Sequence, residues 1–531
     1  MRGGRIAVAL AVLALGVGSQ VAGQTEAAFR SAAGAAGSSF VAAPDFVAPT
    51  VVRTRVADPS NPPSYQVRQC RFYQAYAEVT DSGNPASGVT AVSANLSALS
   101  GGAGAEALSA GAFSLDGVSY GFLSRPLLAT ADPGTYDYSL TSTDQAANAR
   151  VETGLGALVE AGSGAVDAVF LTGLEQGVAS ASLPGVFDSV TGAGVNADAT
   201  VARHGSHSLR VAPANAAAFA TADLGGSGNT VVVRFAVRLA SLPGATVNLF
   251  AVSPGGGATV STAIFLYDAA AGVFAVRWGM SGTVVPGNSA PVPGAWHLVE
   301  MRVSVADPHV LEWRIDAVEQ PTASAANPAQ SVVAINFGTG VTNVTYTAHF
   351  DDIIVSPNAA DYPIGNGKVL GLAIDGAGSH SQPNRFRNNG GSNIDASSWT
   401  RVDDIPADTT ADFVFQRNAV ATRYLEFTFA DTTEESCINA VSALLAYHSA
   451  GTAANNGKAS IFNGATETVV YSGDMSVTSL AYARAVVSPG GGAWAPAALN
   501  GLVARVGYST DVNPNPYWDA LLLEYDVPLA W

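Results

Sequence analysis

Two neighbouring carboxylates, Asp351 and Asp352, stand in the stretch HFDDIIVSP (residues 349–357), whose other residues are typical of a β-strand. Because aspartate is depleted in strands, the pair indicates an acid/base site, a metal site or a polar strand end. Successive side chains of a strand point to opposite faces of the sheet. In a regular strand Asp352 would share a face with Phe350 and Ile354, and Asp351 would point the other way. The two carboxylates then could not act together on one substrate unless a β-bulge redirects one of them.

Other motifs for catalysis or cofactor binding are sparse. The seven histidines form no HxH or HExxH cluster, and no GxSxG motif is present. The glycine-rich stretches SPGGGAT and SPGGGAW lack the lysine of a phosphate-binding loop and are predicted to be hairpin turns. Three tryptophans, Trp278, Trp296 and Trp313, could stack on sugar rings. Trp278 and Trp313 lie on apolar strand faces, so we expect those two in the core.

Length, charge and composition limit the number of domains, the fold class and the partners to be expected. A chain of 531 residues is too long for one core and predicts about three domains. Its formal charge is −17, and its 25 cationic residues include only two lysines, Lys368 and Lys458. This balance leaves no basic face for phosphates, so nucleic acid is not expected as a partner. Abundant glycine and a charged fraction of only 13% indicate an all-β protein.

The two cysteines, Cys70 and Cys437, are far apart and fall in different predicted domains. Their spacing excludes a CxxC-type zinc site and implies no disulfide framework. We therefore expect each to be a small buried hydrophobic residue.

The N-terminus predicts export. Arg2 and Arg5 precede an apolar run over residues 6–17, which is followed by small residues, as in a secretory signal peptide. The run has about 12 residues, and about 20 are needed to span a bilayer, so no transmembrane anchor is expected. Residues 1–28 are assigned to the signal peptide, and the protein is expected to be extracellular or at the cell surface.

The next stretch, TEAAFRSAAGAAGSSFVAAPDF, resembles the start of secreted camelysin-type and biofilm-matrix-type proteins of Gram-positive bacteria. The matching positions are Phe29, Gly37, Ser38, Phe40 and Ala42. Arg30 departs from the pattern, since an acidic or polar residue is usual there. The resemblance covers about 40 residues and implies a processed N-terminal segment over residues 29–49.

Residues 50–152 are predicted to form the first β-domain. Tyr136, Tyr138 and Leu140 alternate with polar residues, the pattern of a half-buried strand. The segment resembles bacterial immunoglobulin-like modules at Thr80, Asp81, Ser87, Gly88, Val89, Asp144, Ala146 and Asn148, with Ala147 where glycine is usual. The resemblance implies an immunoglobulin-like β-sandwich that acts as a spacer, followed by a linker over residues 153–165.

Two further sandwiches are expected. Residues 166–366 carry FLTGLEQGV, RHGSHSLRVAP and HFDDIIV in the order in which similar motifs occur in concanavalin A-like jelly rolls of the LamG and carbohydrate-binding-module type. That resemblance implies a jelly roll that binds a glycan or another cell-surface polymer. Residues 367–531 are predicted to be a C-terminal β-sandwich, because Leu425, Phe427 and Phe429 alternate with polar residues. The fold class is thus all-β, with tandem β-sandwiches.

The jelly-roll resemblance also implies a metal site. In such domains the acid of the early "FE" segment and an aspartate of the last strand approach a structural calcium ion. The matching residues are Glu175 and Asp352, with Leu174 in place of the usual phenylalanine. Glu175 and Asp352 are therefore expected to lie within a few ångströms of each other and to share calcium. A polar strand end without metal is the alternative.

The expected function is that of a secreted, non-enzymatic cell-surface or matrix protein that binds glycan through the jelly roll. The alternative is a polysaccharide-active enzyme, a hydrolase or lyase with a concanavalin A-like fold. The E-x-D-x-x-E strand expected of a laminarinase-like hydrolase is missing from the sequence, which favours binding over catalysis.

Overall fold

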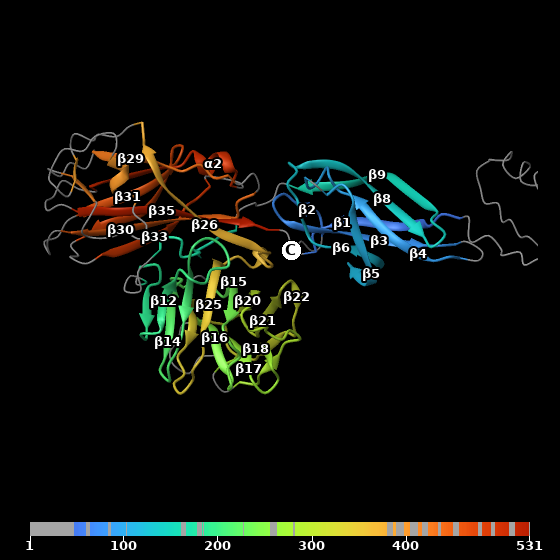
Figure 1. Ribbon diagram of the computed structural model, residues 1–531, viewed down its shortest axis with the longest axis horizontal. Coiled ribbons are helices and arrows are strands. Elements are labelled where there is room, and N and C mark those ends of the chain that lie inside the picture. Colours follow the sequence, from blue (N-terminus) through green and yellow to red (C-terminus); the bar gives the residue numbers. More distant parts are fainter. Residues whose placement is uncertain are drawn as a thin grey trace, which may run out of the picture.

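The computed structural model describes residues 47–529, with gaps at 60–63, 83–85, 102, 161–165, 178–182, 184, 227, 255–262, 280–281, 380–385, 389–397, 404–412, 417–422, 434–436, 450–455, 476–479, 490–493 and 509–515. The predicted signal peptide and most of the segment 29–49 lie outside these residues. The described chain is almost entirely β-strand and forms three units, each with its own sheets and its own large apolar cluster (Figure 1). The all-β prediction is confirmed.

The first unit is one sheet that wraps around a core. Its strands are β1 (Thr50–Ala57), β2 (Val67–Arg68), β3 (Phe72–Thr80), β4 (Val89–Asn95), β5 (Glu106–Leu115), β6 (Val118–Ser124), β7 (Leu127–Leu128), β8 (Gly134–Asp144) and β9 (Ala149–Glu160). Their order is β1-β3-β6-β5-β4-β8-β9-β2, and β7 pairs with β3. Tyr138 and Leu140 of β8 are in the core, as the alternation predicted.

The turn between β8 and β9 contains three positions of the immunoglobulin-like motif named above. Asp144 accepts hydrogen bonds from the backbone N–H and the side-chain amide of Asn148, both at 2.8 Å. Ala147 has a φ of 65°, in the left-handed region that favours glycine. Strand β9 runs to Glu160 and so occupies much of the segment 153–165, where a linker was predicted. That prediction was wrong because the strand continues well past the turn.

The second unit packs two sheets face to face. The first has the order β12-β13-β25-β15-β20-β21-β22, with β10 on β25 and β23 on β21, and the second has the order β11-β14-β24-β16-β17-β18-β19. The strands are β10 (Phe170–Thr172), β11 (Ser189–Thr191), β12 (Val195–Asp198), β13 (Ser208–Val211), β14 (Ala218–Asp223), β15 (Thr230–Leu239), β16 (Val247–Pro254), β17 (Ala263–Asp268), β18 (Val273–Trp278), β19 (Val285–Pro286), β20 (Trp296–Ser304), β21 (His309–Ile315), β22 (Val318–Glu319), β23 (Ala323–Ala325), β24 (Val332–Thr339) and β25 (Ala348–Ser356).

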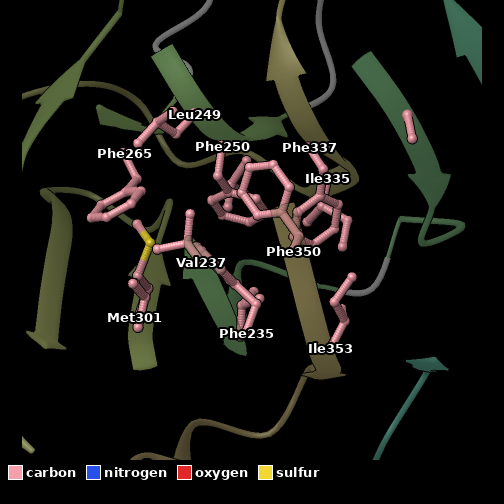
Figure 2. Packing of buried hydrophobic residues seen from close by; sticks show 14 of the residues in the cluster. Phe235, Val237, Leu249, Phe250, Phe265, Met301, Ile335, Phe337, Phe350 and Ile353 are labelled. Atoms are coloured by element: carbon pink, nitrogen blue, oxygen red, sulfur yellow. The ribbon is translucent and has the colours of Figure 1, made fainter. Parts of the chain in front are cut away.

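Aromatic side chains fill the space between these two sheets. The ring of Phe235 lies 4.9 Å from that of Phe250, 5.6 Å from that of Phe337 and 5.9 Å from that of Phe350, measured between centroids (Figure 2). Tilted and edge-to-face pairs of this kind add to the stability gained from apolar burial. Trp278 and Trp313 are also buried in this core, as expected.

The third unit contains β26 (Gly367–Ala377), β27 (Phe386–Asn388), β28 (Val414–Gln416), β29 (Tyr424–Phe429), β30 (Ala440–Ser449), β31 (Asn456–Asn463), β32 (Thr466–Asp474), β33 (Ala481–Val486), β34 (Val503–Tyr508) and β35 (Pro516–Pro528). Short helical segments are η1 (Ala359–Asp361), just before the unit, and η3 (Ser398–Arg401) and α2 (Pro496–Asn500) within it. Strand β26 pairs with β35 through Ala373 and with β29 from Ile374 onward. It therefore connects the strands around β35 with the strands around β29. Leu425, Phe427 and Phe429 lie in the core, as predicted.

The second and third units share a buried interface. The Arg234 and Asp526 side chains, both fully buried, form an ion pair across it. An apolar cluster joins Val232 and Ile354 of the second unit to Val369 and Ala440 of the third. The segment over residues 357–366, between these units, holds the buried Asp361 and Ile364 and is therefore part of the interface.

A disulfide joins Cys70 of the first unit to Cys437 of the third. Both cysteines are buried, as expected, but the expectation that the sequence implies no disulfide was wrong, because the fold brings together two positions that are 367 residues apart. Such long-range proximity cannot be read from cysteine spacing. Among the described residues, no helix has the length and apolar character needed to cross a membrane.

Candidate functional site

The strand that carries Asp351 and Asp352 contains a β-bulge. Between the β15–β25 pairs Arg234/Ile354 and Ala236/Asp351, β25 has one residue more than β15. Asp352, at the bulge, has a φ of 52°. Both carboxylates therefore face the loop at residues 203–204, outside the core that holds Phe350. The prediction that Asp352 shares a face with Phe350 was wrong, since the extra residue shifts the alternation.

Asp352 is held by cationic and backbone donors. Its Oδ2 atom accepts hydrogen bonds from Arg203 Nη1 and lies 2.8 Å from His204 Nδ1, and its Oδ1 atom accepts the N–H of Val369 at 2.7 Å. Burial by itself would raise the pKa of Asp352, but the bond with His204 and the charge of Arg203 bring it below its ordinary value. The pKa of Asp351 is raised by burial and by the neighbouring Asp352 charge.

Glu175 lies in the same buried junction between the second and third units. Its carboxylate accepts hydrogen bonds from the N–H and the hydroxyl of Ser206. Burial, then the charge of Glu524 and, more weakly, that of Asp352, raise the pKa of Glu175 to about 8. Burial raises the pKa of Glu524 to about 7, although its Oε1 atom accepts the N–H of Glu175 at 2.9 Å.

This arrangement does not fit a calcium ion well. Both Asp352 oxygens already accept hydrogen bonds, and Arg203 supplies the counter-charge that calcium would supply. In the part of the chain that the structure describes, no group of three or more His, Cys, Asp or Glu residues is arranged to hold a metal. Glu175 and Asp352 are close enough to interact electrostatically, and a calcium titration decides whether they also bind the ion.

A cleft with other chemistry lies between the first and second units. It has a volume of about 390 Å³. Arg71 and Phe72 of the first unit line one side, and Glu300, Arg314 and Glu319 of the second line the other. Because Phe72 begins β3 and directly follows Cys70 and Arg71, the disulfide fixes this wall relative to the third unit. We refer to this site as the junction cleft.

Arg71 is a buried cation with unused donors. Only 4% of the residue is exposed, and its Nη2 atom donates to Asp361 Oδ1 at 2.8 Å. Its Nε and Nη1 atoms have no hydrogen-bond partner among the described residues. Burial lowers the pKa of Arg71, and the Asp361 charge offsets part of that effect. Buried donors without partners are costly, so Arg71 is a strained cation in the wall of the cleft.

Arg314, on the opposite wall of the cleft, also has a buried donor atom. It lies on the outer face of β21, where it donates through Nη2 to Glu319 Oε1 at 2.6 Å, and its buried Nε has no partner among the described residues. Opposite it in the sheet, Glu300 of β20 accepts the N–H of Gly365 at 2.6 Å. Burial raises the pKa of Glu300, and the Gly365 N–H and the Arg314 charge offset part of this rise.

Apolar groups complete the cleft. Phe72, Pro126, Val318 and Pro363 line it beside the charged groups. A wall with donors, acceptors and apolar surface suits a polyhydroxylated ligand, whose hydroxyl groups both accept and donate hydrogen bonds and whose C–H groups pack on apolar side chains.

Sequence reasoning missed these residues. Arg314 stands between the apolar Trp313 and Ile315, a pattern that indicates an outward-facing side chain, but no local signal connects it with Arg71, which is 243 positions away in the chain. The predicted sugar-stacking residues do not line the junction cleft. Trp313 donates its ring N–H to the carbonyl of Pro321 inside the core, and Trp296 is half-buried elsewhere.

Comparisons with known proteins assign no family. No family model matches the chain. No curated protein matches it either. Among solved structures it is similar to a cellulose-induced protein at 20% identity and a TM-score of 0.26, which covers 31% of this chain and 85% of that one. It is also similar to a tandem of family 22 carbohydrate-binding modules from Paenibacillus barcinonensis, at 11% identity and a TM-score of 0.21, covering 68% of this chain and 98% of that one.

Enzymes are found by the same comparison. A sialidase from Trypanosoma rangeli is 11% identical with a TM-score of 0.24, over 31% of this chain and 27% of that one. The neighbours thus include carbohydrate-binding modules of the β-sandwich type as well as enzymes. At these identities and TM-scores the likeness assigns no activity.

Proposed function

We propose that this chain is a secreted, non-enzymatic surface or matrix protein that binds a neutral glycan in the junction cleft. The observation that carries the proposal is a pair of arginines: the buried Arg71 and the partly buried Arg314 each keep at least one side-chain N–H group without a partner among the described residues. Both line one cleft from opposite domains. A ligand that reaches both must therefore contact the first and second units together.

The charge balance of the cleft favours a neutral polyol over an anion. Arg71 and Arg314 offer donors, but Asp58, Glu300 and Glu319 line the same space. A carboxylate or phosphate ligand would be repelled by these acids. A sugar hydroxyl accepts from a guanidinium and donates to a carboxylate, so it suits both kinds of group. The ring carbons of the sugar would pack against Phe72 and the prolines.

The Cys70–Cys437 disulfide supports the proposed location. Disulfides persist in oxidising compartments such as the extracellular space, so this bond agrees with the exported state that the N-terminal sequence predicts. It also holds the Arg71 wall in place before a ligand arrives. A site that is ordered in advance loses less conformational entropy on binding, and affinity rises accordingly.

One observation favours the alternative, a polysaccharide-active enzyme. Glu300 has a raised pKa and shares the cleft with Glu319, and a glycosidase needs a protonated acid beside a second carboxylate. However, Glu300 is only 1% exposed and already accepts the Gly365 N–H. Its position supports a role in holding the segment at Gly365 and not in contacting a substrate.

A glycan array probed with the full chain tests the proposal, together with an assay for newly formed reducing ends on every polysaccharide that binds. We expect binding to neutral glycans without release of reducing ends. Release that is lost in the Glu300→Gln variant would establish the enzyme instead. Absence of any neutral glycan among the bound probes would contradict the assignment to the junction cleft.

A further inference from the structure

A second pocket lies on the third unit, on the outer face of the sheet formed by β29, β34, β31 and β32. Its volume is about 210 Å³. Gly507 of β34 faces outward there between Tyr424 of β29 and Lys458 of β31, with which it is directly paired. Because glycine has no side chain, a hollow remains between its two neighbours. A Cβ at this position would come within 2.5 Å of the Arg423 carbonyl oxygen, so the hollow requires glycine.

Cationic and aromatic side chains surround the hollow. The Arg505 guanidinium carbon lies 4.5 Å from the centroid of the Tyr424 ring and 4.1 Å from that of Phe462, so both rings hold it in place. Arg505 also donates through Nε to Glu426 at 2.7 Å, and only 28% of its side chain is exposed. The guanidinium is therefore fixed in direction before any ligand binds.

The pocket concentrates positive charge on an acidic protein. Arg423, Lys458 and Arg505 line it, and Lys458 is one of only two lysines in a chain with a net charge of −17. Two carboxylates lie beside them: Glu426 holds Arg505, and Glu467 lies 2.7 Å from Lys458. Three cations against two acids leave this surface positive, in contrast to the junction cleft.

We propose that this pocket is a second saccharide site, selective for a sugar that carries a carboxylate, such as a uronic acid. A fixed, weakly hydrated guanidinium beside an ammonium group recognises a carboxylate through charge-assisted hydrogen bonds. The aromatic rings offer apolar surface to the sugar carbons. At about 210 Å³ the pocket is smaller than the usual ligand cavity, which limits the occupant to about one sugar ring.

This site is independent of the junction cleft, because the two share no residue and lie on different units. The chain would then bind a neutral segment and an acidic segment at separate places. A polymer with both kinds of sugar could engage both sites, and so could two different polymers.

Ligand-observed NMR and calorimetry with the full chain test this second site. The probes are galacturonate, galactose and acetate, which separate the contribution of the charge from that of the ring. We expect galacturonate to bind at least about tenfold more tightly than either of the others, because galactose lacks the carboxylate that accepts charge-assisted hydrogen bonds and acetate lacks the ring that packs on the aromatic side chains. Its affinity should fall as salt is raised.

Variants locate the binding. Arg423→Gln and Lys458→Gln should each weaken galacturonate binding several-fold while the melting temperature stays unchanged. Arg150→Gln is the matched control, because Arg150 is an exposed, ion-paired arginine on the first unit. Unchanged galacturonate binding in both pocket variants would overturn the proposal. That outcome does not bear on the junction cleft, because neither variant lines it.

Discussion

Cys70 and Cys437 are joined by a disulfide, with their Cα atoms 5.5 Å apart, although 367 positions separate them in the chain. The bond ties the first unit to the third and thereby sets where Arg71 and Phe72 lie against the second. The junction cleft is therefore a product of all three units, including one that does not line it.

The double variant Cys70→Ser/Cys437→Ser should be less stable than the native chain. In the chain-entropy model a loop of this length contributes up to about 6 kcal/mol, so a loss of several degrees in melting temperature is expected. Scanning calorimetry with and without a reductant measures it. The reductant should lower the melting temperature of the native chain and leave that of the variant unchanged. Equal melting temperatures would show that the disulfide adds nothing to the assembled units.

Replacing Arg234 by Met should destabilise the interface between the second and third units by about 3–5 kcal/mol, because it leaves the buried Asp526 without its ion pair. Urea unfolding is the measurement. The variant Arg234→Met/Asp526→Leu serves as the control, since it removes both charges and should recover part of the loss. A double variant as unstable as the single one would show that packing, and not the unpaired charge, is responsible.

Stability should fall as the pH rises from about 5 to about 8. Glu175 and Glu524 have ordinary pKa values of 4.5, raised in the folded state to about 8 and about 7. The folded state therefore keeps protons that the unfolded state releases in this range, and the favourable contribution present at low pH is lost. The Glu175→Gln variant, which mimics the protonated acid, should show a flatter dependence of melting temperature on pH. Parallel curves for variant and native chain would contradict this explanation.

Calcium should leave the melting temperature of the native chain within about 1 °C, because Arg203 and the Val369 N–H already satisfy Asp352. A bound ion would otherwise stabilise the folded state by mass action. The Asp352→Asn variant should be destabilised equally with and without calcium. A rise of several degrees with calcium in the native chain, absent from Asp352→Asn, would instead establish the calcium site expected from the jelly-roll resemblance.

Much of the fold follows from local patterns in the sequence. In residues 231–239 apolar residues alternate with Arg234 and Arg238, a pattern that indicates a strand with Phe235 facing inward and Arg234 outward. In the structure Phe235 lies in the core and Arg234 faces the third unit. Since the period of a strand is a local property, a short window suffices. What that window cannot show is that Arg234 would be buried under the third unit, because the burial depends on how the units pack together.

The candidate site depends on how distant segments pack together, which no short window of the sequence shows. The resemblance placed Glu175 and Asp352 in one junction, but the bulge at Asp352 and its pairing with Arg203 depend on the fold. Arg71 and Arg314 become a site only where two domains meet. The pairing of Cys70 with Cys437 likewise follows from the assembled chain and from no motif.

The most direct test of glycan binding in the junction cleft is calorimetric titration with the neutral oligosaccharide that binds best on the array. Three full-length proteins are compared: the native chain, Arg314→Gln and Arg210→Gln. Arg210 is the control, because it lies on the same unit but does not line the cleft and donates to Asn196. Arg314→Gln should weaken binding about tenfold or more, with Arg210→Gln unchanged, since a hydrogen bond from a charged donor contributes about 1.5–3 kcal/mol. Equal affinity in all three proteins would contradict the assignment.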